Sequence, residues 1–254
     1  MARWLGWAGW LALGYGGLCL LMAATQRSFI YFPRPAADPS GRLELLVEGT
    51  PVLVAHRPQP GPKALIYFGG NAEDVSLTRA ELAALLPDTA LYLLHYRGYA
   101  GSGGRPSEAA LRADAQALYA HVAQRHSAVT VVGRSLGTGP AVHLAATRPL
   151  QRLVLLVPFD SLAAVARGAM PWLPVDLLLR DRWDAAAEAP RVRAPTTIVA
   201  AAFDAVVPLR HAEALQRAFP PGVAELVVAP DLDHNTPILD SAAFRAALQP
   251  GYGM

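Results

Sequence analysis

The sequence is poor in cysteine, in lysine and in charged residues as a whole. Its 254 residues include one cysteine, Cys19, so no disulfide can form within the chain. Lys63 is the one lysine among 22 basic residues, charged residues make up 17% of the chain, and the formal net charge is +2. No basic run is interleaved with aromatic residues, so nothing favours nucleic-acid binding. No cysteine–histidine cluster has metal-site spacing, and we expect neither a metal nor another cofactor.

Charge is also missing from the N-terminal segment. Trp4 to Thr25 contains no charged residue and consists mainly of leucine, alanine, glycine and tryptophan. A run of about 20 apolar residues is long enough to cross a bilayer. We therefore expect residues 1–27 to form an uncleaved, single-pass N-terminal transmembrane helix, with the protein in a bacterial inner membrane. A cleaved signal peptide and a buried core helix are the alternatives. Positive charges flank both ends of the run, so its orientation stays open.

Residues 28–254 are expected to form one α/β domain. Short apolar runs alternate with helical patterns of about 10–15 residues, which is typical of parallel β-α-β units. The expected strands are Leu43–Val47, Pro51–His56, Lys63–Phe68, Thr89–Tyr96, a strand beginning at Val129, Leu153–Val157, Thr196–Ala202 and Ala224–Val228. The expected helices are Glu73–Leu86, a helix capped by Ser107 and running to about Arg125, a helix beginning near Leu136, Leu209–Phe219, and about Ile238–Leu248.

Residues 158–195 interrupt this alternation. The segment is too long for a plain loop. We interpret it as a small helical cap, inserted over the strand–turn–helix segment around Ser135, that would shape an apolar acyl pocket near the membrane surface. Ordinary surface helices are the alternative.

The most informative motif is Gly133-Arg-Ser135-Leu-Gly137, directly after a β-branched strand and before a helical pattern. A strand–turn–helix context is what a nucleophile elbow requires, because the sharp turn exposes the serine hydroxyl. The flanking glycines leave room where a Cβ would clash. The sequence therefore predicts Ser135 as a nucleophile. A tight turn with an incidental serine is the alternative.

A serine nucleophile needs a base, a group that orients the base, and donors for the developing oxyanion. His234 is the last of seven histidines and lies in a polar loop after the final expected strand. Asp204 follows the strand Thr196–Ala202, from which a carboxylate can reach that loop. The order serine, aspartate, histidine matches one known triad order. Asp231 and Asp233 are fallback acids only. They are so close to His234 in sequence that their carboxylates cannot easily approach its far nitrogen.

Two backbone N–H groups are candidates for the oxyanion hole. One belongs to Leu136, the residue after the nucleophile. The other belongs to Asn71, in the loop after an earlier strand, where the second donor is expected.

Several segments together carry a family resemblance: Phe29-Ile-Tyr-Phe-Pro33, Phe68-Gly-Gly-Asn71-Ala72, Tyr96-Arg-Gly-Tyr-Ala-Gly-Ser102, Pro106-Ser-Glu108, Gly133-Arg-Ser-Leu-Gly-Thr-Gly139, Pro171-Trp-Leu-Pro174, Asp204-Ala-Val-Val-Pro208 and His234-Asn235. Nearly everything after residue 27 resembles the membrane-anchored α/β-hydrolase-domain serine hydrolases, the group that includes palmitoyl-protein thioesterases. The resemblance implies the α/β-hydrolase fold, a mostly parallel central sheet flanked by helices. It also implies Ser135 as nucleophile, Asp204 as acid and His234 as base.

The chain departs from the family pattern at three loops. Gly69 stands where the family has histidine, Ala201-Ala-Phe203 precedes the acid, and Asp231-Leu-Asp233 precedes the base. We expect a serine hydrolase that cleaves an ester or thioester of a small-molecule, acyl-lipid-like or acyl-protein substrate, attached to a membrane by its N-terminal helix. A serine peptidase of the same fold is one alternative. A non-catalytic, membrane-tethered binding protein is the other, favoured by the altered loops.

Overall fold

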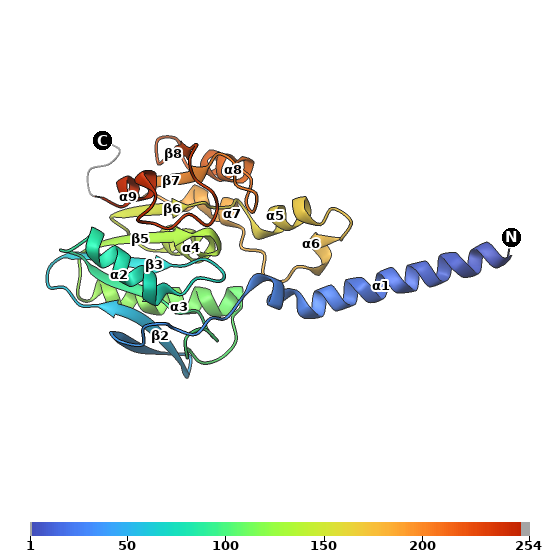
Figure 1. Cartoon of the computed structure of the whole chain (residues 1–254), viewed down its shortest axis with the longest axis horizontal. Helices are drawn as coiled ribbons and strands as arrows, with labels where there is room; N and C mark the ends of the chain where they lie inside the picture. Colours follow the sequence, from blue (N-terminus) through green and yellow to red (C-terminus); the bar gives the residue numbers. More distant parts are fainter. Residues whose placement is uncertain (1, 250–254) are drawn as a thin grey trace.

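The computed structural model describes residues 2–249, with side chains from residue 9 onward, and centres on an eight-stranded sheet (Figure 1). Its strands are β1 (Arg42–Val47), β2 (Thr50–Arg57), β3 (Lys63–Phe68), β4 (Ala90–Leu94), β5 (Ala128–Arg134), β6 (Arg152–Leu156), β7 (Thr196–Ala201) and β8 (Ala224–Ala229). The spatial order is β1-β2-β4-β3-β5-β6-β7-β8. Only the pairs β1–β2 and β2–β4 are antiparallel within this sheet, so the mostly parallel sheet expected from the sequence is confirmed.

Helices cover both faces of the sheet. The helices of the described part of the chain are α1 (Ala2–Ile30), α2 (Val75–Leu85), α3 (Glu108–Ala123), α4 (Thr138–Thr147), α5 (Leu162–Ala169), α6 (Val175–Leu178), α7 (Ala185–Glu188), α8 (Arg210–Ala218) and α9 (Ala242–Leu248), with short 3₁₀ turns η1 (Ser135–Gly137) and η2 (Ala189–Arg191). On β3, Ile66 and Phe68 pack in the core beneath α3, α4 and α8, whereas Leu65 and Tyr67 pack beneath α2 and α9. Strands buried on both faces explain the continuous apolar runs in the sequence.

Local capping decides where the helices begin. The Ser107 side chain accepts a hydrogen bond from the Ala110 N–H, as the sequence predicts for the start of α3. Two predicted starts are wrong by a few residues. Helix α2 begins at Val75 rather than at Glu73, because Asp74 caps it by accepting from the Ser76 N–H. Helix α9 begins at Ala242, because Ser241 is its cap.

Residues 158–195 contain α5, α6, α7 and η2 and are fixed to the body of the protein through Trp183. The Trp183 side chain is fully buried and packs against Gly139 of α4, where an added Cβ would overlap the indole ring. Its Nε1–H donates to the Tyr31 hydroxyl at 3.2 Å. The backbone N–H groups of Arg182 and Trp183 both donate to the Glu108 carboxylate, at 2.7 and 2.9 Å. This segment is therefore an ordered part of the fold.

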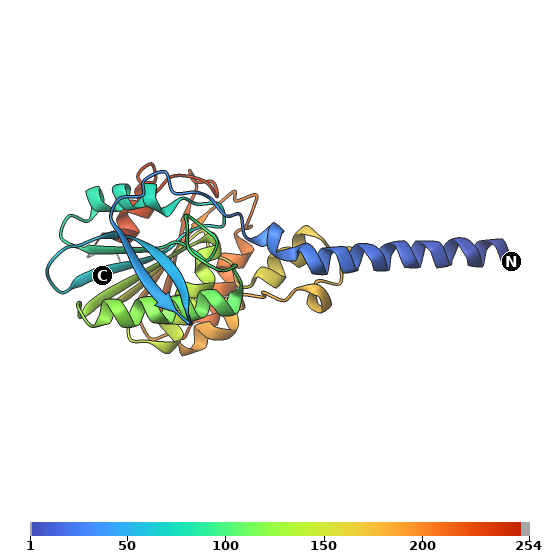
Figure 2. The ribbon, with the colours of Figure 1, turned by 90° about the horizontal axis from the view of Figure 1, so that it is seen from below.

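Helix α1 extends away from the body of the protein (Figures 1 and 2), and its contacts with residues 158–195 include a hydrogen bond from the Tyr15 hydroxyl and those made near its C-terminal end. The exposed apolar side chains along its described part include Trp10, Leu11, Leu13, Leu20 and Leu21. Within the described residues, no helix meets the length and hydropathy needed to cross a bilayer. The structure does not show the transmembrane helix expected for residues 1–27.

The contact between Trp183 and Gly139 generates a stability prediction. Gly139→Ala forces a methyl group into the Trp183 ring, and overpacking of this kind costs about 1–3 kcal/mol. Urea unfolding should show a lower free energy of unfolding for this variant. Gly16→Ala on α1 is the matched control, since no atom lies within 4 Å of the added Cβ. An unchanged midpoint for Gly139→Ala would show that the indole moves aside without cost.

Candidate active site

Ser135 lies at a strained turn between β5 and α4. Its φ of +49° is in the left-handed region, which non-glycine residues rarely adopt. The turn depends on two close approaches. A Cβ on Gly133 would lie 2.6 Å from the Ala141 Cβ, and a Cβ on Gly137 would overlap the Phe68 carbonyl. Glycine at both positions is therefore a steric requirement of the elbow.

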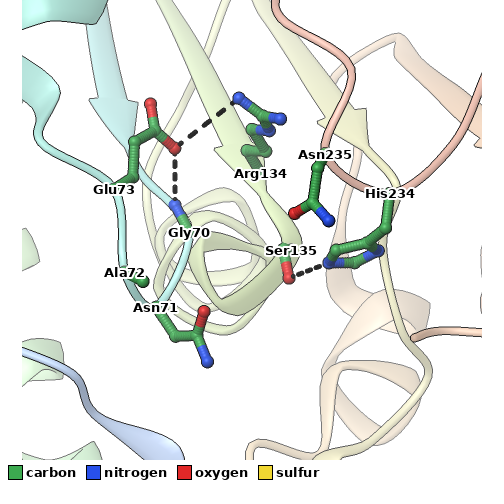
Figure 3. Close-up of a pocket in the computed structure, with 8 residues that line it drawn as sticks. All are labelled: Gly70, Asn71, Ala72, Glu73, Arg134, Ser135, His234 and Asn235. Atoms are coloured by element: carbon green, nitrogen blue, oxygen red, sulfur yellow. Dashed lines mark hydrogen bonds and ion pairs between the residues drawn. The ribbon is translucent and has the colours of Figure 1, made fainter.

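Three loops bring the side chains of Ser135, His234 and Asp204 into one hydrogen-bonded line. The Ser135 Oγ lies 2.8 Å from the His234 Nε2 (Figure 3), and the His234 Nδ1 lies 2.7 Å from the Asp204 Oδ2. An ionised carboxylate only accepts hydrogen bonds, so this geometry assigns the imidazole proton to Nδ1. The lone pair of Nε2 then faces the serine hydroxyl.

The Asp204 side chain is 2% exposed and divides its two oxygens between different partners. Its Oδ1 accepts from the backbone N–H groups of Val206 and Val207, at 2.8 and 2.7 Å. Its Oδ2 is left for His234. The buried carboxylate is thus held by its own loop while it orients the imidazole.

Asp233, one of the fallback acids, shapes the histidine loop instead. Its Oδ1 accepts from the Asn235 N–H at 2.7 Å and from the Thr236 hydroxyl at 3.2 Å. These bonds lower the pKa of Asp233 below its ordinary value, the Asn235 bond most strongly. The side chain that bonds the imidazole Nδ1 is that of Asp204.

The loop that carries the Asn71 N–H lies between β3 and α2 and is held by two tyrosines. The Tyr96 hydroxyl donates to the Gly69 carbonyl at 2.7 Å, and the Tyr99 hydroxyl donates to the Asn71 carbonyl at 2.6 Å. Asn71 and Ser135 line the same pocket. The structure therefore brings this predicted donor residue beside the serine, and Leu136 follows Ser135 in the elbow.

The pocket beside Ser135 differs from the one expected. It has a volume of about 200 Å³ and is lined by Gly70, Asn71, Ala72, Glu73, Arg134, Ser135, His234 and Asn235 (Figure 3). None of these described lining residues comes from residues 158–195. An apolar crevice occurs elsewhere, between α1 and α5–α6, and Met22, Met170, Leu173 and Leu178 are among its lining residues. The expectation that the cap shapes an apolar pocket over the serine is wrong for this pocket.

Sequence reasoning missed two charged residues that line the pocket, Glu73 and Arg134. Glu73 accepts from the Gly70 N–H at 2.8 Å, and Arg134 Nη1 lies 4.0 Å from the same carboxylate oxygen. Arg134 lies between Gly133 and Ser135 in the elbow motif, so the sequence could have placed it beside the nucleophile. It could not have identified Glu73 as its partner.

Relatives and solved structures share this architecture. No protein-family model matches the chain. An uncharacterized protein of Mycobacterium tuberculosis is 35% identical, over 94% of this chain and 91% of its own length. The α/β-hydrolase domain-containing protein aho-3 of Caenorhabditis elegans is 30% identical, over 73% of this chain and 57% of its own. The chain is similar in sequence to α/β-hydrolase-domain proteins and has the α/β-hydrolase fold.

Solved structures show the same fold for this α/β-hydrolase. A hydrolase from Pseudomonas aeruginosa superposes with a TM-score of 0.64 at 19% identity, covering 83% of this chain and 97% of that one. An esterase from Pyrococcus furiosus gives a TM-score of 0.63 at 16% identity, covering 81% and 91%.

The structure gives a physical reason for one departure of this α/β-hydrolase from the family pattern. A Cβ on Gly69 would lie 2.7 Å from Val75 Cγ1 and 3.2 Å from Glu73 Oε2. The space for a side chain at Gly69 is therefore taken by Val75 and by Glu73. Glycine at position 69 thus leaves room for the Glu73 carboxylate in its observed position.

The positive φ at Ser135 generates a prediction that separates strain from chemistry. A non-glycine residue in the left-handed region costs about 1 kcal/mol relative to glycine. Ser135→Gly and Ser135→Ala both lose the hydrogen bond to His234, but only glycine also relieves the strain. Thermal unfolding should therefore give a higher midpoint for Ser135→Gly than for Ser135→Ala. Equal midpoints would mean that the turn is not strained.

Proposed function

We propose that this protein is a serine hydrolase that cleaves an ester or thioester through an acyl-enzyme intermediate. The hydrogen-bonded line from the Asp204 carboxylate through His234 to the Ser135 hydroxyl carries the proposal. A serine hydroxyl is a weak nucleophile until a positioned base accepts its proton. The tautomer inferred from the contact with Asp204 leaves the His234 Nε2 available for that role.

The proposed reaction has two steps. In the first, the Ser135 Oγ attacks the substrate carbonyl carbon while the His234 Nε2 takes the hydroxyl proton. The carbonyl oxygen becomes an oxyanion, which the N–H groups of Asn71 and Leu136 stabilise. His234 then gives the proton to the leaving group, and the acyl-enzyme remains. In the second step His234 takes a proton from a water that attacks the acyl carbon, and the bond from that carbon to the Ser135 Oγ breaks as His234 returns the proton to Oγ and the acid leaves. Asp204 stays ionised throughout and stabilises the imidazolium.

Acyl-lipid-like or acyl-protein substrates are the proposed substrate class. The family resemblance supports them, and so do the exposed apolar side chains of α1 beside the crevice formed with α5–α6. We propose in addition that α1 attaches the protein to a membrane. The support is the stretch without charged residues from Trp4 to Thr25, whose described apolar side chains mostly face solvent.

Covalent labelling tests the catalytic assignment. A fluorophosphonate probe should label the wild-type protein and leave Ser135→Ala unlabelled, because the probe reacts with an activated serine. Asp204→Asn should reduce kcat for a nitrophenyl ester by about 10⁴-fold, since the amide selects the wrong imidazole tautomer. Asp231→Asn is the control and should keep full activity, because Asp231 is exposed. Labelling that persists in Ser135→Ala would reject Ser135 as the nucleophile.

Membrane attachment has a separate test. A variant that lacks residues 1–24 keeps Gln26 and Arg27, which contact residues 158–195. It should move from the sedimented membrane fraction to the supernatant while Ser135 still reacts with the probe. A truncated protein that still sediments with membranes would refute attachment through α1.

A further inference from the structure

Glu73 makes two hydrogen bonds to Gly70, the residue before the proposed oxyanion donor Asn71. Its side chain is 13% exposed, and its Oε2 accepts from the Gly70 N–H at 2.8 Å. The Glu73 backbone N–H reaches the Gly70 carbonyl at 3.4 Å. In a trans peptide the N–H and the carbonyl point to opposite sides. Holding the Gly70 carbonyl towards Glu73 therefore turns the Asn71 N–H away from Glu73.

The Glu73 carboxylate is itself held in place by two hydroxyl groups. Its Oε1 accepts from the Tyr67 hydroxyl at 2.8 Å and from the Thr78 hydroxyl at 2.6 Å. Burial, reinforced by the neighbouring Glu73 charge, raises the pKa of Tyr67, so its hydroxyl remains a donor. With both oxygens engaged, the carboxylate is a rigid support and not a mobile surface group.

The loop needs such a support because of its composition. Gly69 and Gly70 are consecutive residues without a Cβ, and glycine has more backbone freedom to lose than any other residue. The tyrosine bonds hold the carbonyls of Gly69 and Asn71. Glu73 supplies the contact to the residue between them.

Arg134 joins this support to the other two catalytic loops. Its Nη1 lies 4.0 Å from the Glu73 Oε2, and its Nη2 donates to the Thr236 carbonyl at 3.0 Å. It also directly precedes Ser135. Figure 3 shows Glu73 and Arg134 facing each other beside Gly70. The negative Glu73 carboxylate would repel a negative oxyanion that develops near it. The positive Arg134 guanidinium offsets this repulsion.

We propose that Glu73 is a positioning residue for the oxyanion hole. Its carboxylate clamps Gly70 so that the Asn71 N–H stays directed at the oxyanion, and Arg134 balances the charge of the clamp while linking it to the nucleophile and histidine loops. The proposal rests on the proposed hydrolase function, but the clamp itself can be measured without turnover.

Backbone hydrogen exchange and kinetics test the clamp together. Glu73→Ala should accelerate amide exchange in the segment 69–73. It should also lower kcat for a nitrophenyl ester by about tenfold or more, with little change in KM, because a small misplacement of a catalytic group can reduce the rate up to about 10²-fold. Glu73→Gln keeps an acceptor for the Gly70 N–H and should recover most of both losses. Glu44→Gln, at an exposed position on β1, is the matched control and should change neither.

Charge balance gives a second arm. Arg134→Gln leaves the Glu73 carboxylate without its counter-charge and should lower kcat, whereas the double variant Arg134→Gln, Glu73→Gln should recover part of that loss. A structural role alone would change the unfolding midpoint in parallel with kcat, so both are measured. A double variant slower than Arg134→Gln would overturn the charge argument.

Each outcome bears on one claim. Unchanged exchange in Glu73→Ala overturns the clamp whatever the activity. Faster exchange with unchanged kcat overturns its role in positioning the donor. A wild-type protein that neither reacts with the probe nor turns over ester refutes the proposed function, and the exchange result then still decides whether Glu73 holds the loop.

Discussion

The buried hydrogen bond between Asp204 and His234 is the interaction on which the site depends. A carboxylate with almost no solvent exposure must find its hydrogen bonds within the protein, and Asp204 finds three: two backbone N–H groups and the imidazole. The sheet makes this possible. Strands β5 to β8 are adjacent and parallel, so the loops after β5, β7 and β8 leave the same edge of the sheet. A serine, an aspartate and a histidine far apart in sequence meet there.

The same topology explains why the oxyanion loop sits against the elbow. Strand β3 pairs in parallel with β5, and the register places Phe68 beside Gly133. The loop after β3 therefore emerges next to Ser135, so close that Gly137 has no room for a Cβ against the Phe68 carbonyl. The elbow glycines and the strained Ser135 backbone are consequences of packing two loops at one strand end.

The sequence predicts the strands, the fold class and the three residues that meet in the hydrogen-bonded line, because each has a local signature: apolar runs, the glycine–serine–glycine turn, and polar residues directly after strands. It does not predict Glu73 and Arg134 as partners. Charged loop residues are usually solvated, and their pairing depends on which strands are neighbours, which no local pattern encodes. The start of α2 predicted at Glu73 is wrong for a related reason. Glu73 accepts a hydrogen bond from the Gly70 N–H instead of joining the helix, and Asp74 is the cap. The pocket beside Ser135 is not the apolar pocket expected under the cap, because its described lining comes from β5 and from the loops after β3, β5 and β8.

The base of α1 connects the proposed membrane attachment to the rest of the protein. Gln26 donates to the Leu178 carbonyl at 2.9 Å and accepts from the Arg180 N–H at 2.6 Å, and Arg27 pairs with the buried Asp181 at 2.9 Å. These directional bonds fix the axis of α1 relative to α6, which apolar contacts alone would leave free to rotate. The exposed Trp172 and Leu177 lie in the same segment, and the Tyr15 hydroxyl donates to the Trp172 carbonyl at 2.8 Å. If α1 lies in a membrane, this geometry carries Trp172 and Leu177 towards the lipid surface with it. The apolar crevice between α1 and α6, which shares no lining residue with the pocket beside Ser135, would then open at that surface, so its position there depends on the same polar contacts as the attachment.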